Sequence, residues 1–225
     1  LCHKKVIGNL HEENYRHISA FFAHRRGDSI GGTVYLSCPN KYLGAFLFGI
    51  GLFVILSFGF NLFTGKVGYA VENKPSYLGE LGIIWLGNLQ EPPLRPAYYP
   101  NTHIHHKDKA TELCNIKLGD NIKAFLSYHF SAEYLCFVAA DGYKTIQNPV
   151  GQILAIFLPV VVFILSGFEH CVANMYFFTM ADLWSVKAFG YLIIMSLGNS
   201  IGGILIPFMR KGFVSKHDAC FYKLM

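Results

Sequence analysis

Two short polar runs interrupt strongly apolar sequence, and they hold the side chains best placed to do chemistry. The first is Asn61-Leu62-Phe63-Thr64-Gly65-Lys66, and the second is Gly167-Phe168-Glu169-His170-Cys171-Val172-Ala173-Asn174. The imidazole of His170 can carry or transfer a proton near neutral pH, and the hydroxyl of Thr64 can donate or accept a hydrogen bond. The two runs therefore predict a site that exchanges a proton with a small polar molecule or ion and forms hydrogen bonds to it.

A catalytic reading of the second run lacks a nucleophile. Glu169 stands beside His170 and suggests general base chemistry. However, no motif places a Ser or Cys nucleophile, and adjacent positions on a helix do not face one another. We therefore expect the protein not to be an enzyme.

The histidine-rich tract at His103, His105 and His106 is a candidate metal site. Three close histidines without a carboxylate or Cys partner are more typical of a solvated loop. The 6 cysteines stand far apart and form no C-x-x-C pair, so they indicate neither a zinc knuckle nor a disulfide scaffold. We expect no metal and no cofactor, and a membrane metalloenzyme using the histidine-rich tract is the alternative.

The composition points to a membrane as the surroundings of these residues. Of the 225 residues, 52% are hydrophobic and only 15% are charged, and the net charge is +5. A soluble domain carries about 25% charged residues. This balance argues against a disordered chain and against a nucleic-acid-binding protein, which both need more charge. We expect one integral membrane domain over residues 1–225.

Three apolar runs are long enough to cross a bilayer as helices, which takes about 20 residues. Residues 42–65 and 145–168 are 24-residue runs without a formal charge, and residues 188–209 form a third run of 22. Weaker candidates occupy residues 18–36, 77–89 and 124–140. Six spans place residues 18–212 in the membrane, and the basic residues near both ends predict cytoplasmic termini in the cell (inner or plasma) membrane.

The two polar runs belong to an internal repeat. Each is followed by a Gly-Asn pair, 24 residues from Thr64 to Asn88 and 25 residues from Asn174 to Asn199. Three segments per half imply an inverted repeat with two broken helices, whose positive ends offer a site for a small anion. We expect Asn88 and Asn199 to satisfy loose backbone groups at the breaks.

At this point the residues resemble a known family. The first run resembles the E-L-F-T-G-N loop of the formate/nitrite transporter family, with Asn61 and Lys66 as departures. The second run, extended to Met175, is similar to the G-F-E-H-x-V-A-N-M loop of the same family.

The resemblance implies an all-α integral membrane fold. Its protomer is aquaporin-like, with six transmembrane helices as an inverted 3+3 repeat, two broken helices and its own pore in a homopentamer. The central histidine, His170, is hydrogen-bonded to Thr64, and Lys117 is the vestibule lysine. Apolar constrictions are implied at Phe48, Leu52, Leu62 and Phe163. The substrate pathway is predicted to comprise His170, Thr64, Lys117, Asn174, Asn199 and Asn88.

The resulting hypothesis is a channel or transporter for small monovalent anions of weak acids. Formate is the first candidate, and nitrite, hydrosulfide, acetate and lactate are the others. The expected partners are the anion, the lipid bilayer and further copies of the chain, with no nucleic acid. Besides the metalloenzyme, a non-conducting membrane scaffold is an alternative if the departures at Arg25 and Glu133 block the pore.

Glu133 is the departure with the clearest consequence. It lies 16 residues after Lys117, where the family has Asn. An ionised carboxylate facing the pore would repel anions. We expect Glu133 to be held protonated or to pair with Lys117 or Arg25.

Overall fold

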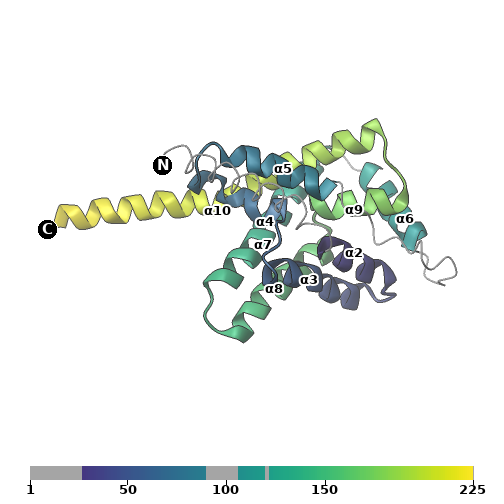
Figure 1. The fold of residues 1–225 in the computed structure, drawn as a ribbon, viewed down its shortest axis with the longest axis horizontal. Coiled ribbons are helices and arrows are strands. Elements are labelled where there is room, and N and C mark those ends of the chain that lie inside the picture. The colour runs from purple at the N-terminus through teal and green to yellow at the C-terminus, as the bar shows by residue number, and fades with distance from the viewer. Residues whose placement is uncertain (1–26, 90–105, 120–121, 225) are drawn as a thin grey trace, which may run out of the picture.

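The computed structural model describes residues 27–89, 106–119 and 122–224, and within these ranges it contains helices and no strands (Figure 1). The predicted all-helical fold is thus confirmed. The elements are α2 (Gly27–Ser37), α3 (Lys41–Ser57), α4 (Phe63–Val67), the 3-10 helix η1 (Gly68–Glu72), α5 (Tyr77–Leu89), α6 (His106–Gly119), α7 (Ile122–Thr145), α8 (Pro149–Leu165), α9 (Cys171–Ala181) and α10 (Val186–Leu224).

The predicted apolar segments match these helices to different degrees. α5 covers the predicted segment 77–89, and the segments 124–140 and 188–209 fall inside α7 and α10. The helices predicted at 42–65 and 145–168 end earlier, at Ser57 and Leu165. The first part of the segment 18–36, including Arg25, lies outside the described residues.

Helix length separates the apolar helices into two groups. Val186–Lys211 is the one stretch of the described chain that is both long and apolar enough to cross a membrane on its own. Lys41–Ser57, Pro149–Leu165 and Cys171–Ala181 are apolar but shorter. The difference from the sequence prediction arises because two of the long apolar runs are divided by a break.

The two breaks have the same backbone construction. Gly59 and Gly167 adopt positive φ angles of 67° and 70°, which a residue without Cβ reaches at little steric cost. The N–H of Phe60 donates to the carbonyl of Ile55, and the N–H of Phe168 donates to that of Phe163. This is the Schellman arrangement, which ends α3 and α8 in the same way.

The starts of the two broken helices also correspond. The side chain of Asn40 accepts hydrogen bonds from two N–H groups in the first turn of α3, and Asn148 does the same for α8. Beyond the breaks, α4 begins after Leu62 and α9 begins after His170, both extended N-cap residues. Leu62 and His170 therefore occupy equivalent places in the two copies.

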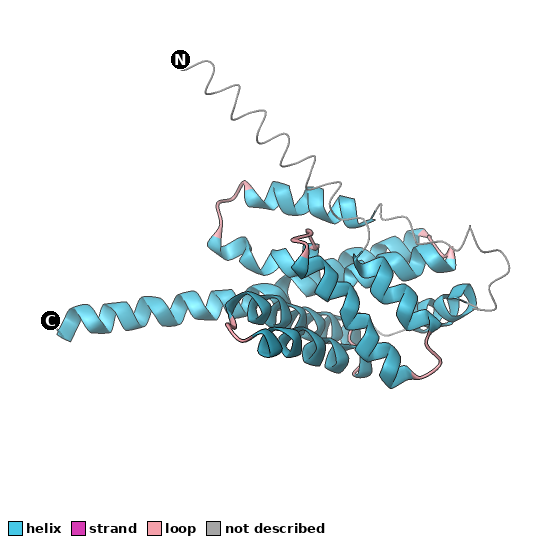
Figure 2. Cartoon of the chain, turned by 60° about the horizontal axis from the view of Figure 1, so that its bottom comes forward, coloured by secondary structure: helices cyan, strands magenta, loops and turns pink. Residues whose placement is uncertain are grey.

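The helices pack around one hydrophobic core, to which both breaks contribute. α3 packs against α2 and α8, α7 packs against α8 and α10, and α9 packs against α6 and α5. The C-terminal part of α10 extends away from the other helices (Figures 1 and 2). This packing places the second break next to α6 and α7, where the site lies.

Candidate functional site

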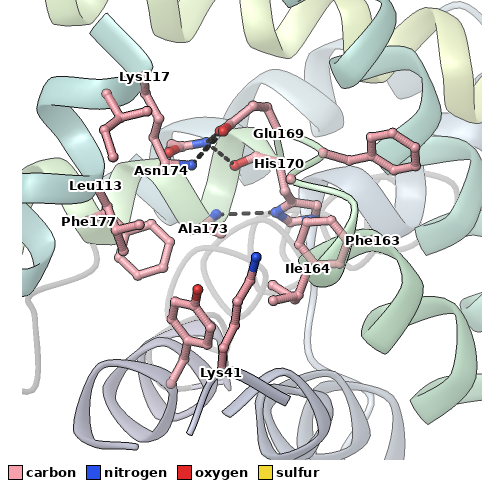
Figure 3. A pocket seen from close by; sticks show the side chains of 14 residues that line it. Lys41, Leu113, Lys117, Phe163, Ile164, Glu169, His170, Ala173, Asn174 and Phe177 are labelled. Atoms are coloured by element: carbon pink, nitrogen blue, oxygen red, sulfur yellow. Dashed lines mark hydrogen bonds and ion pairs between the residues drawn. The ribbon is translucent and has the colours of Figure 1, made fainter. Parts of the chain in front are cut away.

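A cavity of about 220 Å³ lies at the second break (Figure 3). Its walls come from α6, α8, α9 and the loop 166–170, with contributions from α2 and α3. Four of the predicted site residues line it, namely Lys117, Phe163, His170 and Asn174. Since liquid water occupies about 30 Å³ per molecule, the cavity can hold a small anion with a few waters.

The other predicted site residues do not line this cavity. All six are buried in the helix bundle: Thr64, Asn88, Asn199, Phe48, Leu52 and Leu62. The structure thus gathers the residues of the second break with α6, whereas the first break contributes to the protein interior.

His170 has a defined hydrogen-bond role at the start of α9. Its ring is buried, and its Nδ1 atom accepts a hydrogen bond from the N–H of Ala173 at 3.2 Å. A nitrogen that accepts carries no proton, so in this arrangement the neutral imidazole holds its proton on Nε2. Placing a second proton on Nδ1 would break the cap of α9.

The hydrogen bond implied between Thr64 and His170 is not formed, so this prediction is wrong for this structure. Thr64 Oγ1 is buried and has no hydrogen-bond partner among the described residues. The ring of His170 instead turns back onto its own helix and caps Ala173. Thr64 therefore leaves a buried hydroxyl that can still accept or donate a hydrogen bond.

Asn88 holds the first break. Its Oδ1 atom accepts from the N–H of Phe63 at 3.0 Å, and its Nδ2 atom donates to the carbonyl of Asn61 at 3.5 Å. The side-chain amide of Asn88 thus satisfies one backbone N–H and one backbone carbonyl, which are two residues apart. The sequence predicted this role for Asn88.

Asn199 holds the second break in the same way. Its Oδ1 atom accepts from the N–H of Cys171 at 2.8 Å, and its Nδ2 atom donates to the carbonyl of Glu169 at 3.0 Å. Nδ2 also donates to the carbonyl of His129 at 2.7 Å, which ties the break to α7. We call Asn88 and Asn199 the asparagine clamps.

The clamps change the expectation of an anion site at the helix ends. The N–H of Cys171 is bonded to Asn199, and that of Ala173 is bonded to His170. These two groups at the start of α9 are therefore occupied by side chains and are not spare donors for an anion. The charge of the site must come from elsewhere.

That charge comes first from Lys117 on α6. Its Nζ atom lies 2.7 Å and 2.5 Å from the two carboxylate oxygens of Glu169, and it lies 5.6 Å from the ring centroid of Phe177. Asn174 Nδ2 also donates to Glu169 at 2.7 Å (Figure 3). Lys117 is thus paired with Glu169 rather than with Glu133, which corrects one of the two pairings expected for Glu133.

A second lysine in the cavity wall, Lys41, did not follow from the sequence motifs. It lines the same cavity from the start of α3, and Figure 3 shows its side chain reaching toward His170. With Lys41, Lys117 and Glu169 as the charged groups of the lining, two positive charges stand against one negative charge. The lining therefore keeps a net positive charge despite the ion pair. The sequence signal that could have identified Lys41 is its position as a charged residue at the edge of the apolar run 42–65.

The four predicted constriction residues divide into two sets. Phe48 and Phe163 contact each other edge to face at 6.0 Å between ring centroids, and Phe163 lies 5.9 Å from the ring of His170. Leu52 and Leu62 are buried core residues, each 5% exposed. The aromatic pair therefore adjoins the central histidine, and the role of all four residues as gates stays a prediction.

Two further potential metal ligands, Glu133 and Cys136, lie close to His170. Donor atoms of Glu133, Cys136 and His170 all lie within 4.8 Å of one another, and all three residues are buried. A metal bound to Nε2 would require the imidazole proton on Nδ1, where the lone pair accepts from Ala173. The cap of α9 therefore opposes metal binding here. Of the histidine-rich tract, His103 and His105 lie outside the described residues.

His106 is the described member of that tract, and its contacts are with protein. It is buried at the start of α6, where its Nε2 atom lies 2.6 Å from Ser37 Oγ. Burial and, second, the nearby Lys109 ammonium lower the pKa of His106 below its ordinary value. His106 therefore links α6 to the end of α2 through a neutral imidazole.

Comparison with known proteins gives consistent matches. Residues 103–210 match the formate/nitrite transporter family. The formate-nitrite transporter of Plasmodium knowlesi is 26% identical over 216 residues, with 82% of this chain and 68% of that protein covered. The uncharacterized transporter YrhG of Bacillus subtilis is 27% identical over 182 residues, with 73% of this chain and 68% of that protein covered.

Solved structures show the same fold. A pentameric formate channel with formate bound superimposes with a TM-score of 0.74 at 22% identity, covering 91% of this chain and 98% of that one. The relatives are transporters and channels, in agreement with the prediction that this chain is not an enzyme. The likeness predicted from the two loop motifs is thereby confirmed: this chain is similar to the formate/nitrite transporters in sequence and to a formate channel in fold.

Proposed function

We propose that this protein is a membrane channel for small monovalent anions of weak acids, with formate as the first candidate substrate. The observation that carries the proposal is the common cavity of His170, Lys117 and Lys41 at the second break. The cavity thus combines a group that can exchange a proton, a lining of net positive charge and a volume suited to a small anion. The homologous transporters and the formate bound to the similar channel support the same substrate class.

The membrane arrangement we propose has six spans in two inverted halves. The matching caps at Asn40 and Asn148 and the matching asparagine clamps support a repeat of the broken helix. Backbone that leaves a helix at membrane depth requires its polar groups to be satisfied inside the protein. The clamps meet this requirement at both breaks.

Passage through the proposed pore combines attraction and exclusion. The two lysines of the lining raise the local concentration of anions at the cavity. The aromatic pair of Phe48 and Phe163 then presents an apolar surface beside His170, and such a constriction opposes a hydrated ion. We propose that a small acid passes this point more easily when it shares a proton.

Two buried polar atoms without partners in the described part of the chain support the same proposal. Thr64 Oγ1 and Asn174 Oδ1 are buried and lack hydrogen-bond partners among the described residues. Unsatisfied polar atoms are costly unless water or a ligand reaches them. Both atoms are therefore candidate contacts for waters or for the passing acid.

We also propose a homopentamer with one pore in each protomer. The structurally similar channel is pentameric. Large apolar side chains are exposed along α8 and α10, including Leu154, Leu158, Phe189 and Ile193, which suits contacts with lipid or with another protomer. A detergent-corrected mass equal to five chains is expected, and a monomer or dimer mass would contradict the assembly.

The proposed function is tested by flux into proteoliposomes. Formate, nitrite, hydrosulfide and lactate are compared at neutral and mildly acidic pH, with protein-free vesicles as the control. We expect saturable or channel-like formate uptake that rises on acidification. Uptake equal to the protein-free control for all four anions would overturn the proposal and favour a non-conducting membrane scaffold.

A further inference from the structure

We infer that Lys41 is the residue that binds the incoming anion where the cavity opens, a task that the family resemblance assigns to Lys117. The inference rests on the proposed function and names the side chain that first contacts the substrate. It is carried by a contrast between the two lysines of the cavity lining. One is held in an ion pair, and the other has no partner among the described residues.

The amine of Lys117 is already engaged by the protein. It contacts both carboxylate oxygens of Glu169, it lies over the ring of Phe177, and its side chain is only 13% exposed. Asn174 Nδ2 holds the same carboxylate. An anion that displaced Glu169 from the amine would leave a largely buried carboxylate without its cation, which is strongly unfavourable. The ion pair therefore presents an arriving anion with no net charge.

Lys41 differs from Lys117 in both exposure and contacts. It is an exposed residue that also lines the cavity, so it lies where the cavity opens to its surroundings. Its amine forms no hydrogen bond, ion pair or ring contact with another described residue. Since the charges of Lys117 and Glu169 cancel, the net positive charge of the lining is the charge of Lys41.

The turn between α2 and α3 fixes the backbone of Lys41 relative to α6. Lys109 of α6 donates to the carbonyl of Cys38, directly after α2, at 2.7 Å. The side chain of Asn40 then accepts from two N–H groups in the first turn of α3. Those N–H groups are therefore not spare donors, and the amine of Lys41 is the group that this turn offers to an anion.

The side chain of Lys41 suits reversible binding of a small anion. It reaches into the cavity toward His170 (Figure 3). A lysine amine is a strongly hydrated point charge on a flexible stem. It can therefore hold an anion without removing all of its water and can release it again. An anion bound by Lys41 stands at the entrance of the path to His170.

Amine labelling of the detergent-solubilised protein tests where the anion binds. The probe is a neutral acetylating reagent, and peptide mass spectrometry measures the labelling rate of each lysine with and without formate at constant ionic strength. We expect Lys41 to react faster than Lys117. Formate at about twice its dissociation constant should slow the labelling of Lys41 about threefold, because only unoccupied sites react. Lys107, an exposed residue of α6 outside the cavity lining, is the control and should keep its rate.

Formate flux in proteoliposomes tests whether this binding serves transport. At low formate concentration, Lys41→Gln should reduce the flux about fivefold, since contact between two unit charges in water is worth about that factor. At high formate concentration its flux should approach that of wild type, because capture is impaired and passage is not. Lys41→Arg keeps the charge and should retain wild-type flux. Lys107→Gln removes an equal charge outside the cavity and should also match wild type.

The two measurements separate this inference from the proposed function. Labelling of Lys41 that formate does not slow, or equal low-concentration flux in wild type and an assembled Lys41→Gln variant, would overturn the inference. If Lys41→Gln does not assemble, the labelling of the wild-type protein decides. Protection of Lys41 in a protein that carries no formate would instead refute the proposed function and leave the anion site at Lys41 in place.

Discussion

The carboxylate of Glu169 receives the amine of Lys117 between its two oxygens, at 2.7 Å and 2.5 Å. The side chains are only 13% and 9% exposed, so this is a largely buried ion pair. Such pairs contribute little net stability, but the loss of one partner leaves an uncompensated charge. Since Glu169 directly precedes His170, the pair connects α6 to the second break.

Removal of the amine should therefore destabilise the protein more than removal of both charges. We expect Lys117→Met to lower the free energy of unfolding by about 3 kcal/mol, because Glu169 stays buried without its cation. The double variant Lys117→Met with Glu169→Gln should recover most of this loss. Thermal unfolding of the two single variants and the double variant measures the coupling, and additive effects would show that the ion pair does not act as a unit.

The central histidine should control the pH dependence of flux. In His170→Phe, the new phenyl ring can still pack against Phe163. It can neither exchange a proton nor accept the hydrogen bond from the N–H of Ala173. We expect the variant to assemble and its formate flux to lose or sharply alter its pH dependence. Proteoliposome flux over a pH series measures this, and an unchanged profile in an assembled variant would rule out the proposed role of His170.

The two asparagine clamps should have unequal effects. Replacing Asn88 or Asn199 by Ala leaves buried backbone groups unsatisfied, which costs about 1–3 kcal/mol for each group. Asn199→Ala should cost more than Asn88→Ala, because Asn199 makes a third contact, with the carbonyl of His129. Melting temperatures in detergent measure the order. Exposed Asn115 on α6 provides the control, and an Asn115→Ala variant as unstable as the clamp variants would refute this account.

His106 should make stability depend on pH. Burial and Lys109 lower the pKa of His106 in the folded state, so the unfolded state binds the proton more readily. The contribution of His106 to stability is complete above about pH 6.5 and is lost as the pH falls from there through the lowered folded pKa. His106→Gln should reduce this acid-induced loss.

The measurement is the melting temperature above and below pH about 6.5. Lys107→Gln, an exposed neighbour on α6, is the control and should retain the wild-type difference between the two pH values. An equal acid-induced loss in wild type and His106→Gln would assign the pH dependence to other groups.

The sequence predicted the parts of the site that depend on local order along the chain. The polar run around His170 located the second break, and the nearly equal spacings to Asn88 and Asn199 predicted the role of these two residues at the backbone. Both predictions succeed because a Gly-containing turn and an amide clamp are encoded by residue type at a fixed spacing.

The contacts between distant segments could not be predicted in this way. Lys117 and Glu169 are 52 residues apart, and no local pattern states that they pair. Lys41 enters the cavity because α3 packs against α8, which no sequence spacing reports. The bond expected from Thr64 to His170 is not formed, and the ring of His170 instead accepts at Nδ1 from the N–H of Ala173, a contact that no spacing between the two runs reports.

The separation of turn and clamp along the chain has a consequence for biosynthesis. The turn at Gly59 closes within six residues, from Ile55 to Phe60, and such local contacts form in microseconds or faster. The clamp between Phe63 and Asn88 spans 25 residues, which a ribosome adds in about one to five seconds. During synthesis, each broken helix therefore has its bend before it has its clamp. Until its clamp is synthesised, the N–H of Phe63, and later that of Cys171, must donate to water or to another temporary acceptor. Each break is therefore complete only when the helix that carries its clamp, α5 or α10, is in place.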